Sequence, residues 1–330
     1  MKVLRIIELG IIAFFVIGCS VLAINKENDA GRANAATAET AEEGATIFTA
    51  AGTEEQSSAL YEIASVVDFG AVGDGVIDDS ESIQRAIDSG RPIYFPRGVY
   101  AIGRPIIITD KSNWSMYAQD ATFLYTGREY AFHILGAQNC RIEIGQIRSM
   151  EGGGIEFYSD SVKSWNQYVS LTFNTIECKT DCIHIEVMNG GWSNENRIYG
   201  GRFMAGRNGV HVVNSGKDYT NGWKFYDCGI EGVTNGFLFN AGQGYISNMA
   251  VINPRYEEAF ETILKTEGVV FDCLWIGTGV FKPEDIECSS RTNRFEVIAP
   301  IETIWDKTWH RGCIIEGRLM AEKTEYEAVN

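Results

Sequence analysis

The sequence has few prolines and few histidines, and its basic residues are outnumbered by acidic ones. Its 330 residues include 6 prolines, 35 glycines and 4 histidines, and the formal net charge at pH 7 is −16. So few prolines beside so many glycines indicate many turns but no proline-rich linker. The acidic excess argues against binding nucleic acid through a basic surface. Anionic polymers would also be repelled unless a local arginine or lysine patch, or a bound cation, reversed the field.

A CxxC pair is also absent, which argues against a structural zinc site. Cys19 lies near the N-terminus, and the other cysteines are Cys140, Cys178, Cys182, Cys228, Cys273, Cys288 and Cys313. Seven cysteines remain when Cys19 is set aside, and an odd number in a protein outside the cell argues against a complete disulfide framework. The pair in "CKTDC" could form a bridge only if the local geometry allowed it. We therefore expect most of these cysteines to be small core residues.

The N-terminus has the pattern of an export signal. Lys2 and Arg5 precede the apolar run "LGIIAFFVIGCSVLAI", which has the length of a signal peptide core and is short for a spanning helix. "VIGC" resembles a bacterial lipobox with Cys19 as the lipidated residue, while an uncleaved anchor and cleavage near "ANA" at 33–35 are the alternatives. We expect residues 1–24 to export the chain and to attach it to a bacterial membrane or release it outside the cytoplasm.

Residues 25–62 are rich in Ala, Glu and Thr and poor in large apolar residues, so we expect a disordered linker there. The remaining residues, 63–330, form the predicted folded domain.

The stretch "DFGAVGDGVIDDSESIQRAIDSGRPIYFPRGVY" at 68–100 has strong local signals. Asp78 is a candidate N-cap, and Glu81 three residues later completes a capping-box pattern. An apolar face made by Ile83, Ala86 and Ile87 predicts a short helix, which Gly90 would end. "IYFPRGVYAI" predicts a hairpin. Asp78 and Asp79 are therefore expected to cap and form turns, with catalysis as the less favoured role.

This stretch resembles the opening of the pectate-lyase-like superfamily, which includes rhamnogalacturonase-type and polygalacturonase-like enzymes, epimerases and phage tailspikes. The resemblance covers about 40 residues of the chain. It implies an all-β fold, a single-stranded right-handed parallel β-helix whose N-terminal end is plugged by a short capping α-helix. Because this lid is shared by many activities, it names no substrate.

A period of about 27 residues runs through the rest of the chain. One apolar line passes through Ile155, Ile183, Val210 and Phe237, and a second through Ile176, Phe203, Ile230 and Tyr256. Such lines are typical of a solenoid in which each turn stacks on the next. Beyond about 285 the pattern fades, and further strands are expected to form a last turn and a C-terminal cap.

Residues next to the first apolar line should point outward, because side chains alternate along a strand. The outward row then contains His133, Glu156, His184 and His211, with Tyr158 and Glu186 one alternation further on. Imidazole titrates near neutral pH and a neighbouring carboxylate raises its pKa, so this row could perform acid–base chemistry. The alternative is an ordinary polar outer face, and a shift of one residue in register would turn the row inward.

The segment "KTDCIHIE" faintly resembles the catalytic region of family 28 glycosidases, and only Asp181 would match. The partner motifs of that family, Gly-His-Gly and Arg-Ile-Lys, are absent. Because glycoside hydrolysis needs paired carboxylates, polygalacturonase activity is not expected. A turn residue is the alternative role of Asp181.

Arginines and tyrosines provide a further candidate site. Uronate lyases need a cation to neutralise the sugar carboxylate and a base, often arginine. Arg202 and Arg255 are spaced to lie on one face, but the carboxylates nearby form no recognisable calcium motif, so a divalent cation such as Ca²⁺ is only an open alternative. Tyr199 and Tyr226, 27 residues apart, should stack and could carry a sugar. Coil packing is the favoured explanation of the tyrosines, and surface ion pairing that of the arginines.

The sequence therefore predicts an exported β-helix that binds or cleaves an extracellular polysaccharide, with uronate-containing chains as candidates. Polysaccharide lyase and glycoside hydrolase are the enzyme classes considered, and whether the protein is an enzyme is left open. A non-catalytic surface adhesin or tailspike-like protein is the competing class. A measurement of oligomeric state distinguishes the enzyme class from the tailspike-like class, because tailspikes are trimers whereas secreted lyases are usually monomers.

Overall fold

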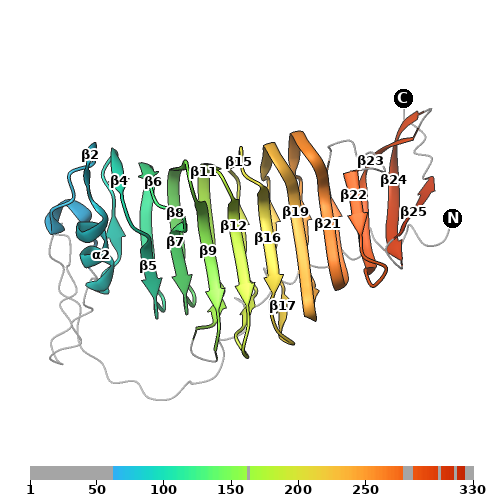
Figure 1. Cartoon of the computed structure of the whole chain (residues 1–330), viewed down its shortest axis with the longest axis horizontal. Coiled ribbons are helices and arrows are strands. Elements are labelled where there is room, and N and C mark those ends of the chain that lie inside the picture. Colours follow the sequence, from blue (N-terminus) through green and yellow to red (C-terminus); the bar gives the residue numbers. More distant parts are fainter. Residues whose placement is uncertain (1–61, 162–163, 278–284, 304–305, 316–317, 324–330) are drawn as a thin grey trace, which may run out of the picture. The chain divides into compact units, whose positions relative to one another are not determined.

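The computed structural model describes residues 62–161, 164–277, 285–303, 306–315 and 318–323. The predictions for residues 1–24, Cys19 included, and for all but the last residue of the linker lie outside these ranges. The described residues form a right-handed parallel β-helix of about nine turns, as predicted. Parallel strands stack along the solenoid (Figure 1), where they form three long sheets and a short fourth one. The sheets enclose a continuous apolar core.

Strands of successive turns pair in parallel and so form sheets that run along the solenoid. Sheet one consists of β5 (Ile106–Thr109), β7 (Tyr130–Leu135), β9 (Gly153–Ser159), β12 (Asp181–Val187), β16 (Asn208–Asn214), the middle of β19 (Gly229–Ser247), the middle of β21 (Arg255–Ile276) and β22 (Ile286–Cys288). Sheet two consists of β1 (Ala64–Ser65), β3 (Ile93–Tyr94), the first parts of β6 (Ser115–Tyr125), β8 (Arg141–Ser149) and β11 (Ser170–Cys178), β14 (Arg197–Tyr199), β18 (Lys224–Tyr226), β20 (Ala250–Ile252), the end of β21 and β23 (Asn293–Thr303).

The other two sheets complete each turn. Sheet three consists of β2 (Asp74–Asp78), β4 (Gly98–Ile102), the second parts of β6, β8 and β11, β15 (Arg202–Met204) and the first parts of β19 and β21. The short fourth sheet contains β10 (Asn166–Gln167), β13 (Ser193–Asn194), β17 (Tyr219–Asn221) and the end of β19. At the C-terminal end the direction changes, because β24 (Asp306–Ile315) and β25 (Arg318–Lys323) continue β23 as antiparallel strands.

Both predicted apolar lines are confirmed. Ile155, Ile183, Val210 and Phe237 are direct neighbours on successive strands of sheet one, and all four are fully buried. Ile176, Phe203, Ile230 and Tyr256 are paired in the same way on sheet three. Each fully buried large apolar side chain contributes about 1.5–3 kcal/mol. This repeated burial fixes which residues of sheet one face outward.

The N-terminal motif forms a lid over the first turn. It contains the 3₁₀ helix η1 (Val66–Phe69) and the helix α2 (Ser80–Asp88), whose apolar face of Ile83, Ala86 and Ile87 is buried at the end of the solenoid (Figure 1). Gly90 has φ +76 after the helix, as its predicted role requires.

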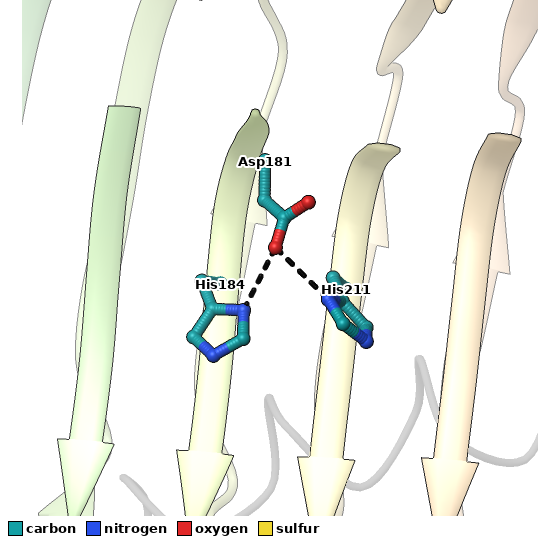
Figure 2. Close-up of side chains that lie close together, drawn as sticks. All are labelled: Asp181, His184 and His211. Carbon is teal, nitrogen blue, oxygen red and sulfur yellow. Dashed lines mark hydrogen bonds and ion pairs between the residues drawn. The ribbon is translucent and has the colours of Figure 1, made fainter. Parts of the chain in front are cut away.

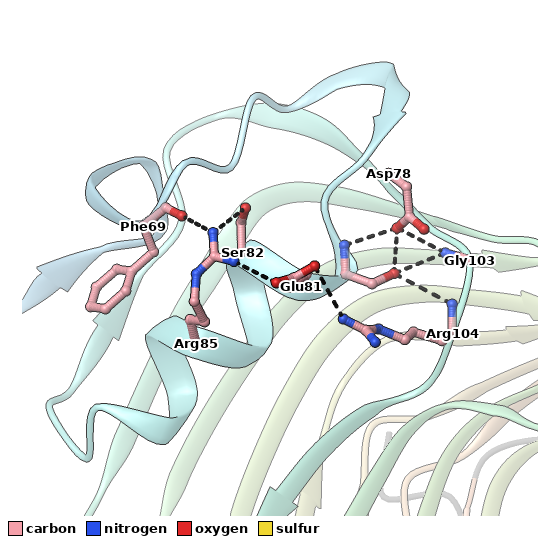
Figure 3. Close-up of polar contacts among 8 residues, drawn as sticks. Phe69, Asp78, Glu81, Ser82, Arg85, Gly103 and Arg104 are labelled. Carbon is pink, nitrogen blue, oxygen red and sulfur yellow. Dashed lines mark hydrogen bonds and ion pairs between the residues drawn. The ribbon is translucent and has the colours of Figure 1, made fainter.

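Two local predictions about the lid are wrong. The N-cap position of α2 is Asp79, and Asp78 instead accepts hydrogen bonds from Ser80 and from the amide of Gly103 (Figure 3). Glu81 pairs with Arg85 rather than closing a capping box. The expected hairpin is absent because β3 and β4 each pair in parallel with strands of neighbouring turns.

Asp79 has a structural role within the lid. Its buried carboxylate accepts hydrogen bonds from the amides of Val72 at 2.6 Å and Gly73 at 3.0 Å. Charged acceptors of this kind hold a turn tightly because the bonds are charge-assisted. The aspartates of the motif therefore bind backbone, as expected.

Six cysteines of the described residues are unpaired thiols: Cys288 is partly buried, and the buried ones are Cys140, Cys178, Cys182, Cys228 and Cys273. Cys178 and Cys182 do not form a bridge, although their sulfur atoms are 3.3 Å apart. In the described part of the chain, no helix has the length and apolar character needed to cross a membrane.

Candidate functional site

The predicted site residues fall into two groups on different sheets. His133, Glu156, His184 and His211 are direct neighbours along sheet one, on strands β7, β9, β12 and β16. Tyr199 and Tyr226 are neighbours on sheet two, and Arg202 starts β15 on sheet three. The predicted row of histidines is therefore present in the expected register, whereas the tyrosines and the arginine belong to another face.

Asp181 contacts the histidine row, so two sites that the sequence suggested separately form one cluster. It is the first residue of β12, and its side chain is 8% exposed. Its Oδ2 accepts hydrogen bonds from Nδ1 of His184 at 3.0 Å and from Nδ1 of His211 at 2.9 Å (Figure 2). One buried carboxylate oxygen thus holds two imidazoles from adjacent turns. Because both Nδ1 atoms donate, both Nε2 atoms are left as the free ends of the rings.

A ladder of polar side chains holds Asp181 from the other side. Asn208 donates to Oδ1 of Asp181 at 2.7 Å, Asn235 donates to Asn208 at 2.9 Å, and Thr262 donates to Asn235 at 2.8 Å. All four residues are buried. This ladder was not predicted, although its members repeat every 27 residues, two positions before the apolar line. The ladder satisfies Oδ1 and so leaves Oδ2 to the histidines.

Tyr130 completes the cluster, and it was also missed. Its hydroxyl donates to Oδ2 of Asp181 at 3.1 Å, and its ring stacks on that of His184 with centroids 5.1 Å apart. Gly153 lies between them in the row, and a Cβ there would overlap the Tyr130 ring. The missing side chain lets a tyrosine from one turn reach an aspartate two turns away.

The cluster has strongly shifted electrostatics. Burial alone would raise the pKa of Asp181, but the hydrogen bonds from His184 and His211 outweigh it and hold that pKa well below its usual range. Burial would lower the pKa of His184, but the carboxylates of Asp181 and Glu186 raise it to about 9. At neutral pH the cluster therefore contains a carboxylate beside an imidazolium.

Glutamates surround the outer ends of the rings. Nε2 of His184 lies 3.7 Å from the carboxylate of Glu186. The hydrogen bond from His184 lowers the pKa of Glu186 and burial raises it. Because the Ser215 hydroxyl also donates to this carboxylate, the pKa of Glu186 lies below its ordinary value. His133 contacts Glu156 through Nδ1 at 2.5 Å. Tyr158 donates to the sulfur of Met188 rather than to this cluster.

The row is less exposed than an ordinary outer face. The side chain of His184 is 10% exposed, against 20% for His211 and 22% for Glu186. The ring of Tyr130 lies against His184 and accounts for part of this cover. His211 and Glu186 are the members that remain open to an approaching ligand.

Within the described residues, two trios have ligand atoms that lie within 4.8 Å of one another and could be considered as cation ligands: Asp181, His184 and His211, and Glu156, His184 and Glu186. In the first trio the shared oxygen already accepts two N–H bonds, so it is a hydrogen-bonded cluster. The second combines a nitrogen with two carboxylates, whereas Ca²⁺ takes six to eight oxygens. Neither trio therefore favours calcium.

The second group lies around a hollow of about 650 Å³ where sheet two turns into sheet three. Arg202 and Arg255 line it and both bind Glu231, at 3.3 Å and 2.6 Å. Tyr199 and Tyr226 stack as predicted, with centroids 5.1 Å apart and planes 9° apart, on the adjacent strands. The structure thus offers two candidate sites rather than one.

Comparison with known proteins agrees with this fold. The family described as rhamnogalacturonase A/epimerase, pectate lyase-like, matches residues 63–274, which is more than half of the chain. The chain belongs to this family. Its described core, with the lid at one end and parallel turns behind it, is the part that the match covers.

Among curated proteins, the preneck appendage protein of Bacillus phage PZA is 48% identical over 134 residues, which are 41% of this chain and 13% of that protein. Plasmin and fibronectin-binding protein A of Streptococcus pneumoniae is 50% identical over 44 residues, 12% of this chain and 6% of that protein. The matches thus span only a small part of these relatives.

Among solved structures, the phiAB6 tailspike in complex with oligosaccharides of Acinetobacter baumannii surface polysaccharide has a TM-score of 0.49 and 13% identity, covering 82% of this chain and 59% of that one. At this level the likeness concerns the fold alone.

Proposed function

We propose that this chain is a surface protein that binds or cleaves an acidic extracellular polysaccharide on sheet one. The observation that carries the proposal is the buried carboxylate of Asp181, which holds His184 and His211 side by side with their Nε2 atoms turned away from it. Buried, charge-coupled groups of this kind cluster at functional sites. The other predicted members, His133, Glu156, Tyr158 and Glu186, extend the same face.

The chemistry that suits this cluster is acid–base chemistry on a uronate. Elimination removes the proton next to the sugar carboxylate, sends the electron pair into a new double bond and releases the neighbouring glycosidic oxygen, which takes up a proton. The imidazolium of His184 would neutralise the carboxylate or supply that proton. The more open His211, with Nδ1–H fixed by Asp181, would accept the first proton at Nε2.

Hydrolysis receives less support from the same residues. It requires one carboxyl group with a raised pKa as the general acid, and a second carboxylate placed opposite. Glu186 has a lowered pKa, and Asp181 is enclosed by hydrogen bonds. Lyase chemistry is therefore the enzyme class that the cluster favours.

A non-catalytic surface adhesin is the second candidate, and one observation favours it. His184 and Asp181 are so well enclosed that the cluster could serve only to hold sheet one together. The similarity of parts of the chain to a phage preneck appendage protein and to a plasmin and fibronectin-binding protein supports the same class.

Location outside the cytoplasm, with attachment through Cys19, is part of this proposal and rests on the N-terminal sequence. Cell fractionation of the full chain and of Cys19→Ser tests it. Loss of the chain from the membrane fraction in the variant supports lipidation, and an unchanged distribution contradicts it.

Incubation with a panel of uronate-containing glycans tests the function. The proposal expects either an unsaturated product or saturable binding, and His211→Ala should reduce both. New reducing ends without unsaturation would indicate hydrolysis instead. No product and no binding across the panel would contradict the proposal and leave the structural role.

A further inference from the structure

The hollow at the corner between sheets two and three has no part in the site on sheet one. Its lining comes from one row of sheet three and from the corner residues beside it: Gln146, Thr175, Arg202, Gly229 and Arg255 in the row, and Phe173, Asn174, Gly201, Asp227, Asn253 and Pro254 at the corner. We propose that this hollow is a second ligand site, which holds a segment of an acidic saccharide chain.

The shape of the hollow suits an extended ligand. The row crosses five successive strands spaced about 4.8 Å apart, so it runs for roughly 19 Å along the solenoid. Its volume of about 650 Å³ lies within the range of ligand pockets, about 300–1,000 Å³. A linear chain lying parallel to the solenoid axis would follow the row.

Glycine creates the floor of the hollow. Gly229 lies in the row between Arg202 and Arg255, and its backbone does not have the positive φ that would require glycine. A Cβ there would lie 3.2 Å from Cγ of Arg202. The absence of a side chain at 229 therefore keeps the space between the two arginines open.

The charged groups of the hollow are held in place before any ligand arrives. Glu231 binds Arg202 and Arg255 with one oxygen each, and Asn253 donates to Asp227 at 2.6 Å. Arg202 has no further side-chain partner among the described residues, so its remaining N–H groups are free to bind a ligand. Fixed donors reduce the entropy that binding costs.

The lining also fits the chemistry of an acidic sugar. Two arginines and one carboxylate, that of Asp227, line the hollow, and Glu231 pairs with both arginines. Glu257 also pairs with Arg255, so the unpaired N–H groups of Arg202, and not a net positive charge, would attract an acidic sugar. The guanidinium fork of Arg202 matches a sugar carboxylate. The side-chain amides of Gln146 and Asn174 form no hydrogen bond within the described residues and can bind hydroxyl groups. The stacked Tyr199 and Tyr226 lie on the strands that lead into this corner.

Binding of tetragalacturonate to the full chain, measured by calorimetry with cellotetraose as the neutral comparison, tests the proposal. Arg202→Gln should raise the Kd for tetragalacturonate about tenfold, the equivalent of one charge-assisted hydrogen bond. Asn174→Ala should raise it severalfold, and because this exposed residue has no partner in the described protein, its folding is not at risk. Arg294→Gln, which removes a comparably exposed arginine paired with Asp272 elsewhere, is the control and should not change the Kd.

Three results would overturn the inference. The first is the absence of tetragalacturonate binding, and the second is equal binding of cellotetraose. The third is binding that is lost in His211→Ala but kept in Arg202→Gln and Asn174→Ala, which would place the ligand on sheet one alone. Conversely, Arg202→Gln and Asn174→Ala proteins that lose tetragalacturonate binding but keep any activity of the sheet-one cluster would support the site in the hollow. That result would hold even if the cluster on sheet one had another function.

Discussion

The ring of Tyr130 crosses Gly153 to reach Asp181, so two turns of the solenoid are joined through the absence of a side chain on the turn between them. Gly153 has no positive φ, so its importance is a matter of space. Gly153→Ala should displace the Tyr130 ring, lower the free energy of unfolding by about 1–3 kcal/mol and disturb His184. Thermal melting measures the first effect and histidine NMR the second.

The matched control for this prediction is Gly190→Ala, because nothing lies within 4 Å of a Cβ built at 190. That variant places a side chain at a positive φ without crowding any neighbour, so it should lower the free energy of unfolding by about 1 kcal/mol. The histidine signals should stay unchanged. Gly153→Ala with wild-type stability and an unmoved His184 signal would contradict the packing described for Tyr130.

Asp181→Asn removes the charge that both imidazoles share. The pKa of His184, raised to about 9 in the wild type, should fall, because only Glu186 and Glu156 then remain to oppose the effect of burial. NMR titration of the ring signals measures this, and the chain has only 4 histidines to assign. Asp272→Asn, an exposed ion-pair aspartate, is the control. A His184 midpoint that stays near 9 in Asp181→Asn would show that Asp181 is not its main partner.

Stability should depend on pH through the same residue. The folded pKa of His184 lies above its ordinary value of 6.5, so its stabilising effect is complete below pH 6.5 and is lost as the pH rises through about 9. The groups that face it are Asp181, Glu186, Glu156, His211 and Tyr130.

Between pH 6.5 and pH 9 the free energy of unfolding should fall by roughly 3 kcal/mol on this account. Chemical denaturation at a series of pH values measures the fall. His184→Gln should be less stable at pH 6.5 and should show a much flatter dependence. Parallel pH curves for wild type and variant would exclude His184 as the source.

The turn-to-turn order of this site followed from the sequence because one apolar period decides which residues face outward. Once Ile155, Ile183 and Val210 point inward, Glu156, His184 and His211 must point outward in the same order. The lid helix followed from local signals in the same way. The two errors in the lid concern which aspartate occupies the cap and which strands pair.

The cluster itself could not be obtained from that period. Alternation gives the face of a side chain but neither its rotamer nor the turn toward which it leans, so Asp181 was assigned to a turn or to a separate site. Tyr130 lies 51 residues from Asp181, and their contact depends on the missing side chain of Gly153. The hollow at the corner depends on Gly229 in the same manner, because both sites are shaped by glycines within rows of larger residues.

The lid should affect stability without affecting ligand handling. Asp79→Ala leaves the amides of Val72 and Gly73 without their buried acceptor and should cost about 1–3 kcal/mol. Asp88→Ala, which removes an exposed carboxylate at the end of α2, should cost less than about 0.5 kcal/mol. Melting curves compare the two, and glycan binding by folded protein should be unchanged in both. Impaired binding by a fully folded Asp79→Ala would place the lid in the functional site.

The central claim is that the cluster of Asp181, His184 and His211 meets the ligand, and histidine NMR with added tetragalacturonate tests it most directly. The ring signals of His184 and His211 should shift in a saturable way, and the pKa of His184 should rise above 9 because the ligand adds a carboxylate to those of Asp181, Glu186 and Glu156. Ring signals that stay fixed while the chain is saturated with tetragalacturonate would show that sheet one does not contact the ligand and would contradict the claim.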